Sequence, residues 1–325
     1  MAVFTKINKR EITYIENQFN LGKIKDFQGI KKGIENTNYL ILTQNKKYIL
    51  TIFEKRVHGG CKYNDLIFFT KLMAKLSKSK IKCPCPVKNK KGNYIFKLKN
   101  KNACIVSFLK GKDKKQLIVN DCFLVGKNIA KLHIASKQIK LFRKNSLSIS
   151  SWGPLLKKVD NRINKLSSNL VNLMKSDLVD IKKKWPKKMP KGIIHSDLFI
   201  DNIFFYKNKF YGFIDFYFSA NDFLTYELAT CINALCFKKR KKSFVFDKRK
   251  SSKLLKGYQS VRKLSLKEKS NLNTLCRGSA LRYLLTRSYD YLNTPKNAII
   301  KIKDPLEYLD KLNFHRNVSS FKDYS

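Results

Sequence analysis

Hydrophobic and polar positions alternate through the first third of the chain, as they do in short strands joined by tight turns. The runs Thr37 to Thr43 and Tyr48 to Phe53 flank the turn Gln44 to Lys47 and predict an antiparallel hairpin. From Asp65 to Lys78 the apolar residues recur at the spacing of an amphipathic helix. Other strand-like runs lie at Gly29 to Gly33, Asn93 to Lys97 and Ala103 to Phe108. Five such runs, with one helix between the third and the fourth, predict a small α+β lobe that ends near Leu109.

The pattern becomes mostly helical beyond Gly111. The expected helical segments are Cys122 to Ala135, Leu155 to Met174 and a C-terminal set from Leu254 to Leu312. A strand-rich island, Gly192 to Asp215, interrupts them, and Asn221 or Asp222 is placed to cap a helix over Phe223 to Phe237. Because no repeat and no disordered linker is visible, we expect two lobes, residues 1–109 and 110–325, that share one cleft.

The formal net charge is +46, from 69 lysines and arginines against 23 acidic residues. Such an excess suggests binding to nucleic acid through its phosphates. The lysines, however, occur along nearly the whole length, and no zinc-finger spacing, aromatic RNA-binding signature or helix-turn-helix is present. A biased composition explains the charge, so we expect no specific nucleic-acid partner. A basic nucleic-acid-associated protein stays as the alternative class.

The eight cysteines are scattered, mostly inside apolar runs, which favours reduced, buried thiols over a disulfide framework. Cys83 and Cys85 are the one close pair, and a zinc site would need a second pair. No run of about 18 apolar residues occurs, and the first residues lack the pattern of a signal peptide. The sequence therefore predicts a cytoplasmic protein with no membrane partner.

The densest chemical signal is His195-x-Asp197 followed after four residues by Asn202, then a hydrophobic strand, a turn and Asp215. Two short strands would bring Asn202 and Asp215 to neighbouring strand ends. Carboxylate and amide oxygens there suit Mg²⁺ on nucleotide phosphates, and a further carboxylate suits the attacking hydroxyl in phosphoryl transfer. The alternative is that these side chains only form turns at the ends of a hairpin. His195 is interpreted as structural, and Glu227 as the anchor of the following helix against this loop.

This set resembles the catalytic and metal-binding loops of protein kinases and, more closely, those of the aminoglycoside phosphotransferase and choline kinase group. The resemblance implies that Asp197 is the catalytic base, Asn202 a metal ligand and Asp215 the main metal-binding carboxylate, with ATP and Mg²⁺ as cofactors. It also implies a bilobal protein-kinase-like fold of the α+β class. Residues 1–109 would form a small antiparallel-sheet lobe that binds the nucleotide, and residues 110–325 a larger, mainly helical lobe for catalysis and acceptor binding.

The nucleotide loop is less distinctive. Gly29 and Gly33 flank a stretch whose backbone amides, with Lys31 or Lys32, could cover phosphates, and Asn38 follows on the next strand. An ordinary β-turn is the alternative. Where protein kinases carry a phosphate-pairing lysine on a strand, this chain has Thr51. The cation would then come from elsewhere, and Lys32 and Arg56 are the first candidates among Lys31, Lys32, Lys55 and Arg56.

A narrower resemblance covers Met1 to about Arg316. Its segments are Glu35 to Tyr39, Tyr48 to Val57, Pro84 to Val87, His195 to Asn202, Ile214 to Asp222 and Lys303 to Tyr308. They look like bacterial homoserine kinase of the aminoglycoside-phosphotransferase type, in which the strand lysine is also threonine. Ile200 departs from that family, which often has arginine there. The resemblance implies ATP-dependent phosphorylation of the L-homoserine hydroxyl in threonine biosynthesis. Choline or ethanolamine, methylthioribose and aminoglycosides remain alternative acceptors within the fold.

Homoserine carries one carboxylate, which calls for a cation, and one ammonium, which calls for an acid. The helical stretch Arg277 to Asp290 offers both, and its candidates for the substrate are Arg282, Arg287 and Asp290. Five positions separate the two later arginines, so they cannot share one helix face. We expect one at the cleft and the other in an ion pair, such as Arg287 with Asp290. That all of them are surface or inter-helix pairs is the alternative. The few acids disfavour a polycationic aminoglycoside, and the oligomeric state is not predicted.

Overall fold

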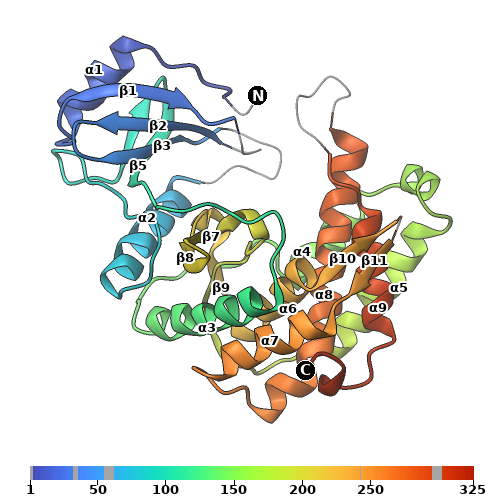
Figure 1. The fold of residues 1–325 in the computed structure, drawn as a ribbon. Helices are drawn as coiled ribbons and strands as arrows, with labels where there is room; N and C mark the ends of the chain where they lie inside the picture. The colour runs from blue at the N-terminus through green and yellow to red at the C-terminus, as the bar shows by residue number, and fades with distance from the viewer. Residues whose placement is uncertain (1–2, 32–35, 55–61, 242, 295–301) are drawn as a thin grey trace. The chain divides into compact units, whose positions relative to one another are not determined.

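The computed structural model describes residues 3–31, 36–54, 62–241, 243–294 and 302–325. The chain divides into two compact units (Figure 1). The first unit is Met1–Gly111 together with Tyr211–Tyr217, and the second is Lys112–Phe210 together with Phe218–Ser325. Of the described helices, none is long and apolar enough to cross a membrane.

The first unit is built on a five-stranded antiparallel sheet in the order β1-β2-β3-β5-β4. Its elements are α1 (Lys9–Gln18), β1 (Ile24–Gly29), β2 (Thr37–Thr43), β3 (Lys47–Ile52), α2 (Tyr63–Lys78), β4 (Ile95–Leu98) and β5 (Lys101–Ser107). The expected hairpin is confirmed, because β2 pairs with β3 with Tyr39 opposite Leu50. The helix expected from Asp65 to Lys78 is also confirmed as α2.

Helix α1 was not expected, although its start is visible in the sequence. Asn8 and Glu11 form a capping box, in which Asn8 accepts from the Arg10 backbone and Glu11 accepts from the Asn8 backbone. Ile12 and Ile15 then join the hydrophobic core of the sheet. Each such buried side chain stabilises the fold by about 1.5–3 kcal/mol. The helix therefore covers the core residues of one sheet face.

The second unit is mainly helical. Its helices are α3 (Val119–Ser136), α4 (Ile149–Leu156), α5 (Leu170–Lys184), α6 (Leu224–Leu235), α7 (Lys248–Gln259), α8 (Leu266–Asn293) and α9 (Leu306–Arg316). Its short strands are β6 (Lys191–Ile194), β7 (Ile203–Tyr206), β9 (Ala220–Phe223), β10 (Phe237–Arg240) and β11 (Ser243–Phe246). Strand β8 (Lys209–Phe213) falls partly in each unit and pairs with β7. The fold is thus of the expected α+β class.

Two local predictions in the second unit were wrong. The single helix expected over Leu155 to Met174 is broken into α4, a 3-10 turn (Asn161–Lys165) and α5. Asp160 caps the 3-10 turn, and Asn169 has a left-handed backbone with φ of 58° at the start of α5, so a continuous helix is interrupted twice. Asn221 and Asp222 lie in β9 and not at a helix cap, since α6 begins after Phe223 without a side-chain cap.

The described cysteines are all free, and all but Cys85 are buried, as expected for reduced thiols. His315 of α9 is also fully buried, and its ring is hydrogen-bonded to Tyr324 and Asn233. Burial, with the nearby charges of Lys311 and Arg277, lowers the pKa of His315 to about 3. The native state therefore holds this ring neutral.

A pH dependence of stability follows from His315. Its native pKa lies below the unfolded value of about 6.5, so the unfolded chain takes up the proton first as the pH falls. We expect this residue to remove about 2 kcal/mol of unfolding free energy between about pH 7 and pH 5, measured by urea unfolding. The His315→Gln variant should show a correspondingly flatter pH slope, and an unchanged slope would contradict the assignment.

Candidate active site

The loop that carries His195, Asp197 and Asn202 follows β6 directly, and β6 pairs with β9 immediately before α6. Glu227 of α6 is fully buried and accepts the backbone N–H of His195 and that of Ser196, the latter at 3.0 Å. A buried carboxylate with two such donors is strongly satisfied. The expectation that Glu227 anchors α6 against this loop is confirmed. Ser196 has a left-handed backbone with φ of 67°, which is uncommon for a residue other than glycine.

Asp197 is held on both carboxylate oxygens. The Asn202 amide donates to its Oδ2 at 3.1 Å and to its backbone oxygen at 2.8 Å, while the Tyr283 hydroxyl lies 3.5 Å from Oδ1. Burial raises the pKa of Asp197, and the nearby charges of Arg282, His195 and Lys303 oppose that rise. An oriented carboxylate of raised pKa in a loop is a suitable acceptor for a hydroxyl proton.

The amide nitrogen of Asn202 is committed to Asp197, which leaves its side-chain oxygen available as a hard ligand. Asp215 belongs to the first unit, is exposed and has a left-handed backbone with φ of 62°. In the described part of the chain, no group of three His, Cys, Asp or Glu side chains could hold a metal ion. Mg²⁺ binds through one or two carboxylates together with water and substrate phosphates, so the oxygens of Asn202 and Asp215 are of the right chemistry for it.

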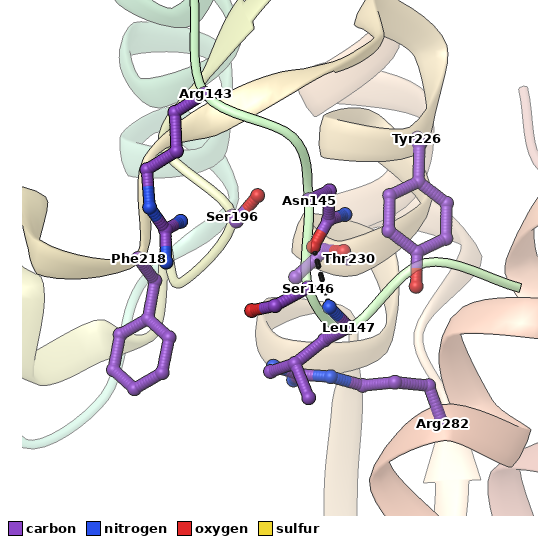
Figure 2. Close-up of a pocket in the computed structure, with 9 residues that line it drawn as sticks. All are labelled: Arg143, Asn145, Ser146, Leu147, Ser196, Phe218, Tyr226, Thr230 and Arg282. Carbon is purple, nitrogen blue, oxygen red and sulfur yellow. Dashed lines mark hydrogen bonds between the residues drawn. The ribbon is translucent and has the colours of Figure 1, made fainter. Parts of the chain in front are cut away.

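A small pocket opens beside this loop in the second unit (Figure 2). It is lined by Arg143, Asn145, Ser146, Leu147, Ser196, Phe218, Tyr226, Thr230 and Arg282. Figure 2 shows the two arginines entering from opposite sides, with Asn145 and Leu147 between them. The Asn145 oxygen accepts from the Leu147 backbone at 2.9 Å and fixes the turn between these residues.

The three residues that the sequence suggested for substrate binding, Arg282, Arg287 and Asp290, have different surroundings on α8. Arg282 of α8 lines the pocket and is 7% exposed. Arg287, about 140° further around the helix, donates to Glu307 of α9 at 2.6 Å, where the sequence suggested Asp290 as the partner. Asp290 lies near the end of the same helix and is partly exposed.

The segment Lys303 to Tyr308, which is one of the segments that resemble homoserine kinase, packs near the loop of Asp197. Tyr308 stacks on Tyr283 with ring centroids 4.9 Å apart, and Tyr283 is the residue whose hydroxyl approaches Asp197. Glu307 forms ion pairs with both Arg287 and Lys311. The Lys303 ammonium lies 5.2 Å from the centre of the Phe199 ring, two residues after Asp197. Residues 303–308 therefore help to pack α8 and α9 around the carboxylate of Asp197.

In the first unit, Thr51 stands where the resemblance would place a lysine, and its side chain makes a neutral hydrogen bond. Its hydroxyl donates to the Asn38 side-chain oxygen at 2.8 Å, and the side chain is 2% exposed. Gly29 ends β1, where an added Cβ would meet the Val3 side chain at 2.7 Å, so a packing reason for glycine exists at that position. Lys32, Gly33 and Arg56 lie outside the described residues.

Comparison with known proteins decides the family. A family model described as "Phosphotransferase enzyme family" matches residues 26–259. The protein belongs to this phosphotransferase family. Curated relatives of this phosphotransferase include the homoserine kinase of Brucella anthropi, 40% identical over 324 residues, which cover 100% of this chain and 97% of that protein. The homoserine kinase of Agrobacterium fabrum is also 40% identical, over 100% of this chain and 98% of that protein.

Solved structures show the same fold at low sequence identity. An amicoumacin kinase, solved in complex with AMP-PNP, Ca²⁺ and Ami, matches with a TM-score of 0.71 at 13% identity, over 98% of this chain and 94% of that one. A choline kinase from Cryptosporidium parvum matches with a TM-score of 0.67 at 15% identity, over 95% of this chain and 94% of that one. These likenesses confirm a kinase fold of the expected type for this phosphotransferase.

Sequence reasoning missed most of the residues around Asp197 in this phosphotransferase. Arg143, Tyr226 and Tyr283 come from a loop, from α6 and from α8, and no local motif marks them. A signal was present for Tyr283, since it follows Arg282 in the segment already singled out. Arg143 lies in an irregular stretch after α3, where spacing carries no information.

The anchor at Glu227 yields a prediction for activity. Glu227→Gln keeps the shape but turns one oxygen into a donor, so one of the two backbone N–H groups loses its present acceptor. We expect the unfolding free energy to fall by about 1–3 kcal/mol and kcat by about tenfold, with the ATP KM nearly unchanged. Urea unfolding and steady-state kinetics would measure both. A kcat equal to that of the wild type would show that this anchor is not needed for catalysis.

Proposed function

We propose that this phosphotransferase is an ATP-dependent homoserine kinase that forms O-phospho-L-homoserine, an intermediate of threonine biosynthesis. The observation that carries the proposal is the 40% identity to curated homoserine kinases along the whole length of the chain. The loop around Asp197 has the chemistry that such a reaction requires. The enzyme works in the cytoplasm, without a specific nucleic-acid or membrane partner.

The reaction needs a carboxylate at the attacking oxygen. The side-chain oxygen of homoserine forms a bond to the γ-phosphorus of ATP, and the bond from that phosphorus to the β-γ bridging oxygen breaks. Asp197 takes the hydroxyl proton, and ADP leaves with the electron pair of the broken bond. Asn202 and Tyr283 hold the carboxylate in one orientation, which lowers the entropic cost of reaching the transition state.

Asn202 and Asp215 are the proposed ligands of Mg²⁺, through their side-chain oxygens. When bound, Mg²⁺ neutralises charge on the phosphates of ATP. Residues 1–109 are proposed as the nucleotide-binding lobe, with Gly29, Lys32, Gly33, Asn38 and Arg56 near the phosphates. Residues 110–325 are proposed as the catalytic and acceptor-binding lobe, with Arg282, Arg287 and Asp290 on the acceptor side.

Because Thr51 supplies no charge, another cation is expected to contact the phosphates. Truncation of the correct residue, with Lys32→Ala and Arg56→Ala tested first, should raise the ATP KM by an amount equal to about 1–3 kcal/mol. Lys25→Ala, on the exposed surface of β1, serves as a charge control. If no single replacement among Lys31, Lys32, Lys55 and Arg56 raises the ATP KM, backbone amides and metal carry the phosphates.

An ADP-release assay with a panel of acceptors tests the proposed function. L-Homoserine should be the preferred acceptor over L-serine, choline, methylthioribose and kanamycin. A preference for choline or kanamycin would show that the proposed acceptor is wrong, although the protein would still be a kinase. Absence of ADP formation with every acceptor, together with tight nucleic-acid binding, would favour the alternative class.

A further inference from the structure

Arg282 differs from the other arginines of its helix. Arg277 pairs with Asp177 and Asp180 of α5, and Arg287 pairs with Glu307 of α9. Among the described residues, no carboxylate lies within the 4.0 Å ion-pair distance of Arg282, including that of Asp197. The residue is only 7% exposed, and it lines the pocket beside the loop of Asp197.

The described surroundings of Arg282 stabilise this buried charge through aromatic rings and longer-range attraction, and not through an ion pair. Its guanidinium carbon lies 3.9 Å from the centre of the Tyr283 ring. Such a contact offsets only part of the cost of removing a charge from water. A planar guanidinium binds a carboxylate through two parallel hydrogen bonds. An anionic ligand in the pocket would therefore supply the ion-pair contact that the described residues do not.

The other residues that line the pocket also favour an anionic ligand. Of the nine described residues that line it, two are arginines and none is Asp or Glu. The Ser196 hydroxyl, also in this lining, is buried and has no hydrogen-bond partner among the described residues. Asp222 already accepts from the Asn145 amide at 2.7 Å and from the Phe223 backbone at 2.7 Å. The lining thus offers donors and positive charge, and none of its described residues supplies a carboxylate for a substrate ammonium.

From these observations we infer that the pocket recognises its acceptor by the carboxylate, through Arg282, and that the α-amino group contributes little. The inference rests on the proposed function, because it assigns the carboxylate of homoserine to this pocket. It also adds an activity: hydroxy acids without an amino group are acceptors. Amino alcohols that lack the carboxylate are excluded by the same charge.

Two analogues separate the groups of homoserine. 3-Aminopropan-1-ol is homoserine without its carboxylate, and 4-hydroxybutanoate is homoserine without its amino group. With the full-length enzyme, ATP and Mg²⁺, we expect kcat/KM for 3-aminopropan-1-ol to be at least about 100-fold below that for homoserine. The value for 4-hydroxybutanoate should stay within about tenfold of homoserine.

Replacement of the arginine should remove this discrimination. Arg282→Met keeps most of the buried volume, and it should lower kcat/KM for the two carboxylates at least about 100-fold while leaving 3-aminopropan-1-ol within about threefold. Arg282→Lys should lose less, because it keeps the charge without the planar fork. Arg162→Met, at an exposed arginine of the same unit paired with Asp160, is the control and should change none of the three acceptors.

Calorimetric binding of the two analogues makes the inference independent of turnover. If homoserine is phosphorylated but 3-aminopropan-1-ol is used equally well, or Arg282→Met lowers all three acceptors by one factor, the inference fails and the proposed function stands. If homoserine is not phosphorylated, the proposed function fails. The binding of 4-hydroxybutanoate then decides whether the pocket is a carboxylate site. Binding that Arg282→Met weakens at least about tenfold supports a carboxylate site, whereas no binding, or equal binding of both analogues, overturns it.

Discussion

Asp197→Asn is expected to lower kcat by at least about 100-fold, a rise of about 2.7 kcal/mol in the activation barrier. The variant keeps the size of the side chain but removes the proton acceptor. The contacts that orient residue 197 come from the Asn202 amide and the Tyr283 hydroxyl. The ATP KM and the unfolding free energy should therefore change little, and steady-state kinetics with homoserine would measure the loss.

Asp201→Asn provides the matched control for this prediction. Asp201 lies four residues later in the same loop and is exposed, and it receives no role in the proposed reaction. It should retain kcat within a few fold of the wild type. Near-normal turnover by Asp197→Asn, or an equal loss in both variants, would contradict the assignment of Asp197 as the base.

Gly257→Ala is expected to destabilise the second unit by at least about 3 kcal/mol, the upper end of the usual range for overpacking. Helices α3 and α7 lie side by side (Figure 1), and each presents a glycine to the backbone of the other. A Cβ on Gly257 would lie 2.0 Å from the Phe123 carbonyl oxygen, and one on Gly126 would lie 2.0 Å from that of Leu254. A backbone carbonyl cannot move aside as a side chain can, so the helices would have to separate.

Gly153→Ala in α4 is the control for the packing prediction. The only described atom near an added Cβ there is the flexible Lys182 ammonium at 3.4 Å, and alanine favours a helix over glycine by about 1 kcal/mol. Thermal and urea unfolding should show a stable Gly153→Ala and a strongly destabilised Gly257→Ala. Equal stability of the two variants would show that the α3–α7 contact relaxes at little cost.

The elements that the sequence predicted well are those with regular local patterns. The hairpin of β2 and β3 and helix α2 follow from period-two and helical spacing, which the side chains facing the core impose. The break between α4 and α5 could not be predicted in this way, because it depends on a left-handed residue, Asn169. The capping signal at Asn221 and Asp222 was misleading, since the tertiary pairing of β9 with β6 takes precedence over it.

The candidate site shows a similar division. Asp197 and Asn202 are close in sequence, so their spacing was enough to predict that they lie together. The structure places them in hydrogen-bond contact. Arg143 and Tyr226 line the same pocket as Arg282 only because of long-range packing, which no local pattern reports. The partner of Arg287 was missed for the same reason, because Glu307 lies on another helix.

The most direct test of the central claim is the identity of the phosphorylated product. Phosphorus NMR of the wild-type enzyme with ATP, Mg²⁺ and L-homoserine should show one phosphomonoester on the side-chain oxygen of homoserine for each ADP formed. The same spectrum with Asp197→Asn should show almost none over the same time. ADP without a homoserine phosphomonoester, or phosphate transferred to choline in preference to homoserine in a mixture of the two, would contradict a homoserine kinase.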